Sequence, residues 1–317
     1  MALPVGTILG NYRLLRTIGE GGMAAVYEVE HTGLGVHYAL KTFTFDPKDD
    51  EDGMLRTKFI EEGKLLARLK HPNIVHVFDL AFDEERKLLY FVMDLVLFAD
   101  GNPYTADDVD REDIDEDMVF EWFADVCQAL DYGHAQGIVH RDVKAANLLL
   151  TQDKHVVLAD FGISHIVGGK LHAELNPSKT SRIEDGTVTI LGTPHLIAPE
   201  VDAGAEATAA ADAYSLGAMM FEILTGKWFD QCENPAELLE GLAYDWTNAL
   251  ALFLDDDPAQ RPETYMELVE QMRADRELRE EAARRRKRLR RWTFIVIGAL
   301  IALTPLAFAC FGLLALH

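Results

Sequence analysis

The sequence of 317 residues is long enough for one or two domains, and it is strongly acidic. Apolar residues make up 49% of it and charged residues 26%, which is typical of a globular protein that buries a full core. The formal net charge of −23 argues against nucleic acid as a partner, because nucleic acids attract basic surfaces. Residues 273–291 differ from the rest, since ten basic and four acidic side chains give them a net charge of +6.

The first 95 residues are predicted to form a strand-rich unit with one helix. Three β-rich runs, YRLLRTIGEG, AAVYEVEH and VHYALKTFTF, are separated by glycine or by His-Thr-Gly, as in successive hairpins. Residues 57–71 have helical spacing, Pro72 ends them, and KLLYFVMDLV at 87–96 is again a strand. The buried face of the helix should carry Phe59, Leu65, Leu66 and Leu69.

The rest of the chain is predicted to be mostly helical. The acidic stretch 100–117 contains Gly, Pro and Asn and should be a solvated loop. Apolar residues recur at helical spacing from Val119, and Gly133 and Gly137 should end that helix. NLLL and HVVLAD flank the turn TQDK and predict a small hairpin, while residues 212–226 predict an apolar helix closed by glycine. The chain is therefore expected to have an α+β fold, with a β-rich lobe followed by a larger helical lobe.

The cysteines and the N-terminus indicate a reducing compartment. Cys127, Cys232 and Cys310 are far apart and match no metal-binding spacing, so a disulfide framework is not expected. The N-terminal MALPVGTILGNYRLL has no basic segment followed by an apolar one, so we expect no signal peptide. Any catalytic part should therefore stay in the cytoplasm.

The stretch GEGGMAAVYEVEH nearly matches the phosphate-binding pattern G-x-G-x-x-G-x-V, with Ala24 in place of the third glycine. Taken by itself, the match fits a plain turn as well as a nucleotide loop. The stretch HRDVKAANLLL is more informative, because Asp142 and Asn147 precede a DFG triplet whose Asp160 ends a strand. Two carboxylates and an amide at neighbouring strand ends can hold a divalent cation, and a remaining carboxylate can orient a substrate hydroxyl.

Together with Lys41 of YALK and Glu62 on the following helix, these residues resemble the eukaryotic-type protein kinase family, in its bacterial (Hanks-type) serine/threonine branch. The resemblance runs from about Ile18 to Pro262. It implies a bilobal protein-kinase fold with a β-rich N-lobe and a helical C-lobe. The predicted bounds are 12–272 for the kinase domain, 12–95 for the N-lobe and 96–272 for the C-lobe.

The resemblance implies that ATP binds between the two lobes. Lys41 would contact the α- and β-phosphates and pair with Glu62, while Glu61 is a competing choice that the spacing to HPNIV disfavours. Met93 would be the gatekeeper at the start of the hinge. The implied phosphate-loop and hinge residues are Ile18, Gly19, Glu20, Gly21, Gly22, Met23, Ala24, Ala25, Val26, Met93, Asp94 and Val96.

The resemblance also implies the catalytic roles. Asp142 would be the catalytic base, and Lys144 would neutralise the γ-phosphate. Asn147 and Asp160 would bind Mg²⁺, for which Mn²⁺ can substitute. A lysine two residues after the catalytic aspartate marks the Ser/Thr-directed branch, so the expected partners are proteins with Ser or Thr hydroxyls.

GTPHLIAPE, residues 192–200, resembles the substrate-docking loop of the family and is called the docking loop below. Glu200 at its end should pair with Arg261, and Asp212 should anchor the catalytic loop. Two features depart from the family. Leu196 replaces the aromatic residue usual in G-T-P-x-Y-x-A-P-E, beside His195. The 35 residues that separate Gly226 from Arg261 are fewer than in most relatives, so the helix there should be shortened.

Phosphorylation of the chain itself is a further expectation. Arg141 directly precedes the catalytic aspartate, and in this family such an arginine commonly binds a phosphorylated activation loop. Residues 163–191 are polar and rich in hydroxyls. We expect autophosphorylation there, with Thr187 and Thr189 favoured because they lie close to LGTP. A merely solvated polar loop is the alternative.

Two other functions stay open. A pseudokinase scaffold that recruits partners to the membrane would predict the loss of Lys41, Asp142 or Asp160, and all three are present. A small-molecule phosphotransferase on the same fold is less well supported, because the docking loop serves peptides. Both alternatives share the fold and differ in what receives the phosphate.

The C-terminal region is predicted to cross a membrane. Residues 293–316 carry no formal charge, and at about 1.5 Å per residue they can span a hydrocarbon core of roughly 30 Å. Pro305 is tolerable within such a helix. We place a transmembrane helix at 292–316, after a basic juxtamembrane segment at 273–291.

The charges beside this span predict its orientation. By the positive-inside rule the basic segment stays cytoplasmic, next to anionic lipid, with Trp292 at the interface. We therefore expect a single-pass protein of the cell inner membrane whose kinase domain faces the cytoplasm. Because His317 alone follows the span, no outside sensor is expected, and a signal would come from a partner or from homodimerisation in the membrane.

Overall fold

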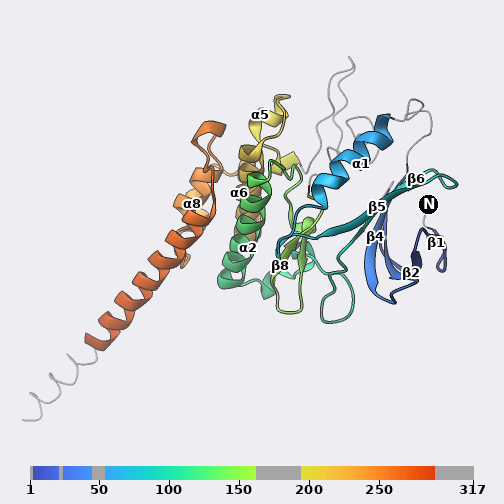
Figure 1. Cartoon of the computed structure of the whole chain (residues 1–317). Coiled ribbons are helices and arrows are strands. Elements are labelled where there is room, and N and C mark those ends of the chain that lie inside the picture. Colours follow the sequence, from blue (N-terminus) through green and yellow to red (C-terminus); the bar gives the residue numbers. More distant parts are fainter. Residues whose placement is uncertain (1–2, 21–23, 45–53, 162–193, 290–317) are drawn as a thin grey trace, which may run out of the picture. The chain divides into compact units, whose positions relative to one another are not determined.

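The N-terminal part of the chain forms one antiparallel sheet (Figure 1). The computed structural model describes residues 3–20, 24–44, 54–161 and 194–289. The sheet has six strands in the order β1-β2-β3-β4-β6-β5, with bounds Ile8–Leu9, Tyr12–Glu20, Ala24–His31, His37–Thr44, Leu88–Met93 and Val77–Asp83, respectively. Four of them, β2, β3, β4 and β6, confirm the predicted strands, and β1 and β5 are additional.

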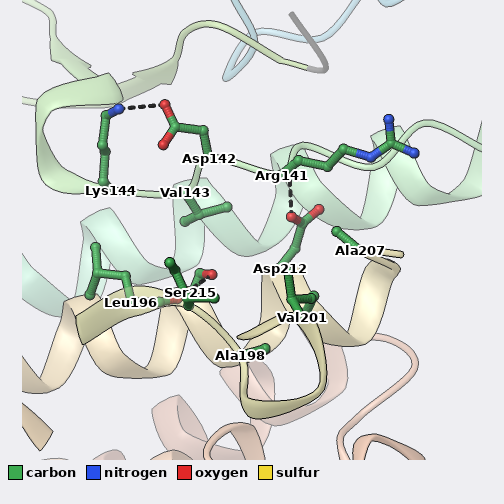
Figure 2. A pocket seen from close by; sticks show the side chains of 12 residues that line it. Arg141, Asp142, Val143, Lys144, Leu196, Ala198, Val201, Ala207, Asp212 and Ser215 are labelled. Carbon is green, nitrogen blue, oxygen red and sulfur yellow. Dashed lines mark hydrogen bonds and ion pairs between the residues drawn. The ribbon is translucent and has the colours of Figure 1, made fainter. Parts of the chain in front are cut away.

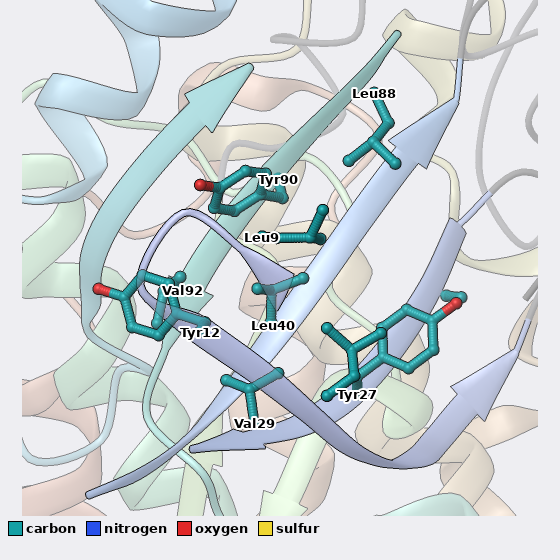
Figure 3. Close-up of a cluster of buried hydrophobic side chains, with 10 residues drawn as sticks. Leu9, Tyr12, Tyr27, Val29, Leu40, Leu88, Tyr90 and Val92 are labelled. Atoms are coloured by element: carbon teal, nitrogen blue, oxygen red, sulfur yellow. The ribbon is translucent and has the colours of Figure 1, made fainter. Parts of the chain in front are cut away.

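The two faces of this sheet have different roles. One face carries a hydrophobic cluster made of Leu9, Tyr12, Leu14, Ala25, Tyr27, Val29, Leu40, Leu88, Tyr90 and Val92 (Figure 3). Because side chains alternate along a strand, the neighbours of these residues point the other way. Phe43 and Phe91 lie on that second face and contact Phe59, whose ring stacks on Phe91 at 4.4 Å. Val26 and Lys41 share this face and are paired in register.

The helix of the N-lobe, α1, spans Met54–Leu66. The prediction of a helix over 57–71 is therefore correct in place but wrong at both ends. Phe59 is buried as expected, but Leu65 is 44% exposed. Six residues turn an α-helix by about 600°, which puts Leu65 far from the side of Phe59. Leu69 is buried, but it lies in the loop after the helix.

The helical lobe is built on two long helices, α2 (Glu116–Ala135) and α6 (Ala209–Thr225), which pack against each other. The carboxylate of Asp115 begins α2 by accepting the N–H of Met118 at 2.8 Å. Gly133 lies inside α2, so the expectation that it breaks the helix is wrong. Gly226 ends α6 with φ +71°, as the sequence predicts.

The remaining elements of the described chain are short. The predicted hairpin is confirmed as β7 (Leu148–Leu150) and β8 (Val156–Leu158). The acidic stretch contains two single turns, η2 (Ala106–Asp108) and η3 (Arg111–Asp113). The others are η4 (Ala145–Asn147), η6 (Pro194–Leu196), α5 (Pro199–Asp202), η7 (Phe229–Gln231), α7 (Pro235–Leu239), α8 (Trp246–Phe253) and η8 (Pro258–Gln260). The helix α7 after Gly226 is short, with five residues.

The C-terminal region is helical as far as it is described, over residues 266–289. Within the described ranges, no helix is both long and apolar enough to cross a membrane. The transmembrane helix predicted at 292–316 lies outside those ranges, so it stays a prediction.

A buried ion pair joins the end of the docking loop to the segment around Arg261. The side chain of Arg261 is fully buried and donates to both carboxylate oxygens of Glu200, at 2.7 and 2.9 Å. It also donates to the carbonyl oxygens of Asp255 and Ala210, both at 2.8 Å. The predicted pair is confirmed, and its geometry is the bidentate one that arginine favours.

Replacing Glu200 by alanine should destabilise the protein by about 3–5 kcal/mol, because it leaves the guanidinium of Arg261 buried without a counter-ion. Glu281→Ala is the matched control, since it breaks an exposed pair with Arg285 and should change stability little. Urea denaturation followed by circular dichroism measures both. Equal midpoints for the two variants would contradict the expectation.

Candidate active site

A cavity of about 240 Å³ is lined by residues of both lobes. Nine of the residues predicted to bind ATP or metal line it: Ile18, Gly19, Val26, Lys41, Met93, Asp94, Val96, Asn147 and Asp160. Its walls are largely apolar, and Lys41 and Asp160 place charges within it. The cavity can therefore accept a ligand that has both an apolar part and a charged part.

Other predicted residues lie elsewhere. Ala25 belongs to the hydrophobic cluster of Figure 3, on the opposite face of the sheet, and Glu20 is exposed. Ala24 is half-buried in β3 but is not among the lining residues. Asp142 and Lys144 line a neighbouring pocket. Outside the described part of the chain lie Gly21, Gly22, Met23, Thr187, Thr189 and the side chain of Glu62.

Several residues that were not predicted also line the cavity. They are Ala39, Val75, Pro103, Ala146, Leu149 and Ala159, while Leu95 lies within the predicted hinge, between Asp94 and Val96. Strand alternation could have indicated Ala39, because it lies two residues before Lys41 and shares its face. Leu149 lies in β7, but Asn147 belongs to the turn η4, so strand alternation does not relate the two. Ala146 lies in the turn η4, and Val75, Pro103 and Ala159 lie in loops, where side-chain directions follow no simple period.

Lys41 and Asp160 form an ion pair across the cavity, with 2.5 Å between Nζ and Oδ2. Burial favours a higher pKa for the Asp160 carboxyl, but the adjacent Lys41 ammonium outweighs it and lowers the pKa below its ordinary value. Asp160 is therefore ionised at neutral pH. The predicted partner of Lys41, Glu62, has its side chain outside the described part, and the competing Glu61 is exposed on α1.

Hydrogen bonds join Asp142 to Lys144 and Asn147 in the catalytic loop, and Figure 2 shows the contact with Lys144. The ammonium of Lys144 forms an ion pair with the carboxylate of Asp142. The side-chain N–H of Asn147 donates to the backbone carbonyl of Asp142 at 2.7 Å and to its carboxylate at 3.1 Å. Asp142 and Lys144 line a pocket of about 30 Å³ together with Leu196 and Ser215. The carboxylate of Asp142 thus contacts Asn147, which lines the cavity, and also shares the smaller pocket with Leu196 of the docking loop.

The backbone of this loop is fixed by buried groups. Asp212 accepts the N–H groups of His140 and Arg141, both at 2.7 Å, which confirms its predicted role as an anchor. Burial lowers the pKa of the His140 imidazole, so this ring is neutral. Its Nε2–H donates to the carbonyl of Ala159 at 2.9 Å, and its Nδ1 accepts from the N–H of Asp142 at 3.2 Å. His140 therefore links the catalytic loop to the segment after β8 that carries Asp160.

Phe161 fixes the residue before it, Asp160. Its ring is 4% exposed and lies against the His140 ring, with 4.8 Å between centroids. The ring also lies directly on Gly133 of α2, where a Cβ atom would be 2.2 Å from its Cζ. Only hydrogen at position 133 permits this approach. The glycine inside α2 is thus needed for the packing of Phe161.

The metal-binding capacity of the site is limited. Among the residues that the structure describes, no group of three or more His, Cys, Asp or Glu side chains could hold a metal ion. The carboxylate of Asp160 and the amide oxygen of Asn147 are two oxygen donors that line one cavity. Mg²⁺ commonly binds one or two protein oxygens and completes its shell with phosphate and water. The site therefore fits Mg²⁺ in the company of a phosphate ligand.

Comparison with known proteins shows the family. Residues 12–279 match the protein kinase domain. The chain is 33% identical over 227 residues to a probable serine/threonine-protein kinase, PknB, of Lactococcus lactis, which covers 71% of this chain and 33% of that protein. It is 36% identical over 230 residues to the serine/threonine-protein kinase PknJ of Mycobacterium tuberculosis, covering 71% and 36%.

A solved structure agrees with these matches. The crystal structure of the Mycobacterium tuberculosis PknI kinase domain superposes with a TM-score of 0.65 at 28% identity, covering 86% of this chain and 99% of that one. The chain therefore belongs to the protein kinase family, in its bacterial serine/threonine branch, and its bilobal fold is confirmed. It spans about a third of the length of the curated relatives it matches.

Gly133→Ala should displace the Phe161 ring and with it Asp160, because the added methyl group has no room. We expect a loss of stability of about 1–3 kcal/mol and a larger loss of nucleotide affinity than in a control. Gly217→Ala is that control, since its Cβ would meet Phe253 and Leu254 in the helical lobe. Thermal unfolding and nucleotide titration measure the two effects. Unchanged nucleotide affinity in a folded Gly133→Ala protein would contradict the role of this glycine.

Proposed function

We propose that the protein is a serine/threonine protein kinase that transfers the γ-phosphate of Mg²⁺-ATP to protein hydroxyls. The observation that carries the proposal is the joint placement of Lys41, Asp160 and Asn147 in one cavity whose walls are apolar. A purine ring suits such walls, and a triphosphate suits the charged part. The names of the curated relatives support serine and threonine as acceptors.

Each charged residue has a distinct task in this proposal. Lys41 holds the α- and β-phosphates, and its pairing with Asp160 keeps both side chains in place. Asp160 and Asn147 would hold Mg²⁺, which neutralises charge on the phosphates when bound. These residues act by positioning the phosphates and by neutralising their charge, because the protein contributes little covalent chemistry to phosphoryl transfer.

Asp142 acts on the acceptor. Its carboxylate lines the pocket next to the docking loop, where a Ser or Thr side chain can enter. It orients the hydroxyl and receives its proton as the new oxygen–phosphorus bond forms and the bond to the β-phosphate oxygen breaks. The ammonium of Lys144, already paired with Asp142, lies where it can offset charge on the transferred group.

Asp160→Asn and Lys41→Met should each lower phosphate transfer by about a hundredfold or more, because each removes a charge that the phosphates need. Lys64→Met, at an exposed position of α1, is the matched control and should stay active. Labelled ATP with a protein acceptor measures the transfer. Full activity of either site variant would refute the assignment. Nucleotide binding without transfer in the unaltered chain would indicate a pseudokinase, and transfer to small molecules alone a different phosphotransferase.

We propose also that the kinase phosphorylates its own activation loop. The support is the state of Arg141, whose guanidinium donates to the exposed carboxylate of Glu206 at 3.2 Å while its buried Nε has no partner. A phosphate carries more charge than a carboxylate and more acceptor oxygens, so it can displace Glu206. Thr187 and Thr189 are the favoured acceptors, although they lie outside the described residues.

Mass spectrometry of the full chain after incubation with Mg²⁺-ATP should find phosphate within residues 163–193, at Thr187 or Thr189. The Lys41→Met protein, whose phosphate transfer should be about a hundredfold slower or more, should carry at most a trace there. An active protein without phosphate in this segment would contradict the proposal.

Membrane attachment is the third part of the proposed function. Its support is the uncharged stretch 293–316, preceded by seven basic residues among the eight at 284–291. Such a segment would hold the kinase at the cytoplasmic side of the inner membrane, where ATP is available. Homodimerisation through the span would then bring two kinase domains together.

Fractionation of cells should leave the full chain with the membranes after a high-salt wash, because apolar insertion is insensitive to salt. A chain truncated after Leu289 keeps most basic residues and should be released by salt, and one truncated after Met272 should be soluble throughout. Release of the full chain by salt would show that the basic residues alone hold it.

A further inference from the structure

The docking loop is held from two sides in the part that the structure describes. Its single turn η6 directs Leu196 inward, where this side chain is 6% exposed and lines the pocket with Asp142 (Figure 2). The hydroxyl of Ser215 on α6 donates to the carbonyl of Leu196 at 2.7 Å. The inward contact is thus apolar, with one hydrogen bond to the backbone.

The outward contact is made by His195. Its imidazole stacks on the indole of Trp228, with 3.7 Å between ring centroids and 11° between planes. Its Nδ1 lies 2.8 Å from a carboxylate oxygen of Asp230. Since a carboxylate only accepts hydrogen bonds, Nδ1 carries the proton and donates it. The stacking on Trp228 therefore fixes the plane of the imidazole, and the hydrogen bond to Asp230 fixes which way the ring points within that plane.

Trp228 is itself anchored. Its indole N–H donates to the carboxylate of Glu222 near the end of α6, at 3.0 Å. The following residue, Phe229, packs its ring against Phe221 of the same helix at 5.5 Å. His195 covers one face of the Trp228 indole, and Trp228 is still 42% exposed. The shortened region after Gly226 thus presents a fixed platform to the docking loop.

We propose that His195, Trp228 and Asp230 form a clasp that positions the docking loop for the acceptor protein, in place of the aromatic residue expected at position 196. The two departures from the family are the replacement of the aromatic residue by Leu196 and the short region after Gly226. We relate them to each other, because the short region supplies an aromatic ring, that of Trp228, to the docking loop. His195 is a positioning residue, since it acts on the acceptor through the adjacent Leu196 and the pocket with Asp142. The inference rests on the proposed kinase function.

The experiment uses the full chain with His195→Ala, Trp228→Ala, the double variant and His195→Phe, which keeps a ring for stacking. His155→Ala is the matched control, because His155 also lies beside a carboxylate, that of Asp125 at 3.1 Å, but next to β8. The probe is a Ser-containing peptide selected by the unaltered chain from a degenerate library. KM for the peptide, KM for ATP, and hydrogen exchange over residues 194–198 are measured for each protein.

The KM for the peptide should rise about tenfold in both alanine variants, with the KM for ATP unchanged, because stacking orders the loop and not the nucleotide cavity. The KM for the peptide should rise no further in the double variant than in the single variants, because each single variant already removes the stacking of His195 on Trp228. His195→Phe should recover most of the affinity, and exchange over 194–198 should be faster in the alanine variants than in the control.

Three results would overturn the clasp: an unchanged peptide KM in both alanine variants, an equal rise in the KM for ATP, or unchanged exchange over 194–198. The exchange measurement needs no turnover, so it separates this inference from the proposed function. A chain that transfers no phosphate, yet shows faster exchange in the alanine variants, would refute the kinase assignment and leave the clasp standing as a structural contact.

Discussion

The buried carboxylate of Asp212 is the constraint on which the catalytic loop depends. It is 1% exposed, accepts the N–H groups of His140 and Arg141, and lies 2.8 Å from Nε2 of His134. Burying a carboxylate without donors is strongly unfavourable, and these three groups offset that cost. In return they hold Arg141 at φ +70°, a backbone conformation that residues other than glycine seldom adopt.

That strained turn determines the position of Asp142, the proposed catalytic base. Asp142 follows it directly, and its N–H is held by His140, whose other nitrogen reaches the carbonyl before Asp160. Asp160 also has a left-handed backbone, with φ +61°. Arg141 lines the smaller pocket and Asp160 the larger cavity, and their two unfavourable backbone conformations persist because buried contacts over-determine them, as is common at functional sites. Phe161 adds the apolar part of this restraint by packing on Gly133.

The sequence predicted the parts of the site that depend on local periodicity and on the order of motifs along the chain. It did not predict the contacts that depend on tertiary packing. Alternation and helical period located β2, β3, α2 and α6, and the order of the motifs predicted most of the residues that line the cavity. β5 was missed because VFDLAFD shows no regular alternation of apolar and polar residues. The pairing of Lys41 with Asp160, 119 residues away, could not follow from spacing, since two carboxylates on α1 competed for it. The stacking of His195 on Trp228 had no sequence signal either.

Helix α6 relates the catalytic loop to the docking loop. Asp212 holds the catalytic loop, Ser215 holds the carbonyl of Leu196, and Glu222 holds Trp228. At about 100° per residue, Ser215 and Glu222 lie roughly 60° and 80° from Asp212, so all three project from one sector of the helix. The other sides of α6 are buried among apolar residues, including Leu216, Met220 and Phe221, which resist rotation of the helix. A shift of α6 would therefore move Asp142 and the docking loop together, and the distance between the Asp142 carboxylate and the docking loop would change little.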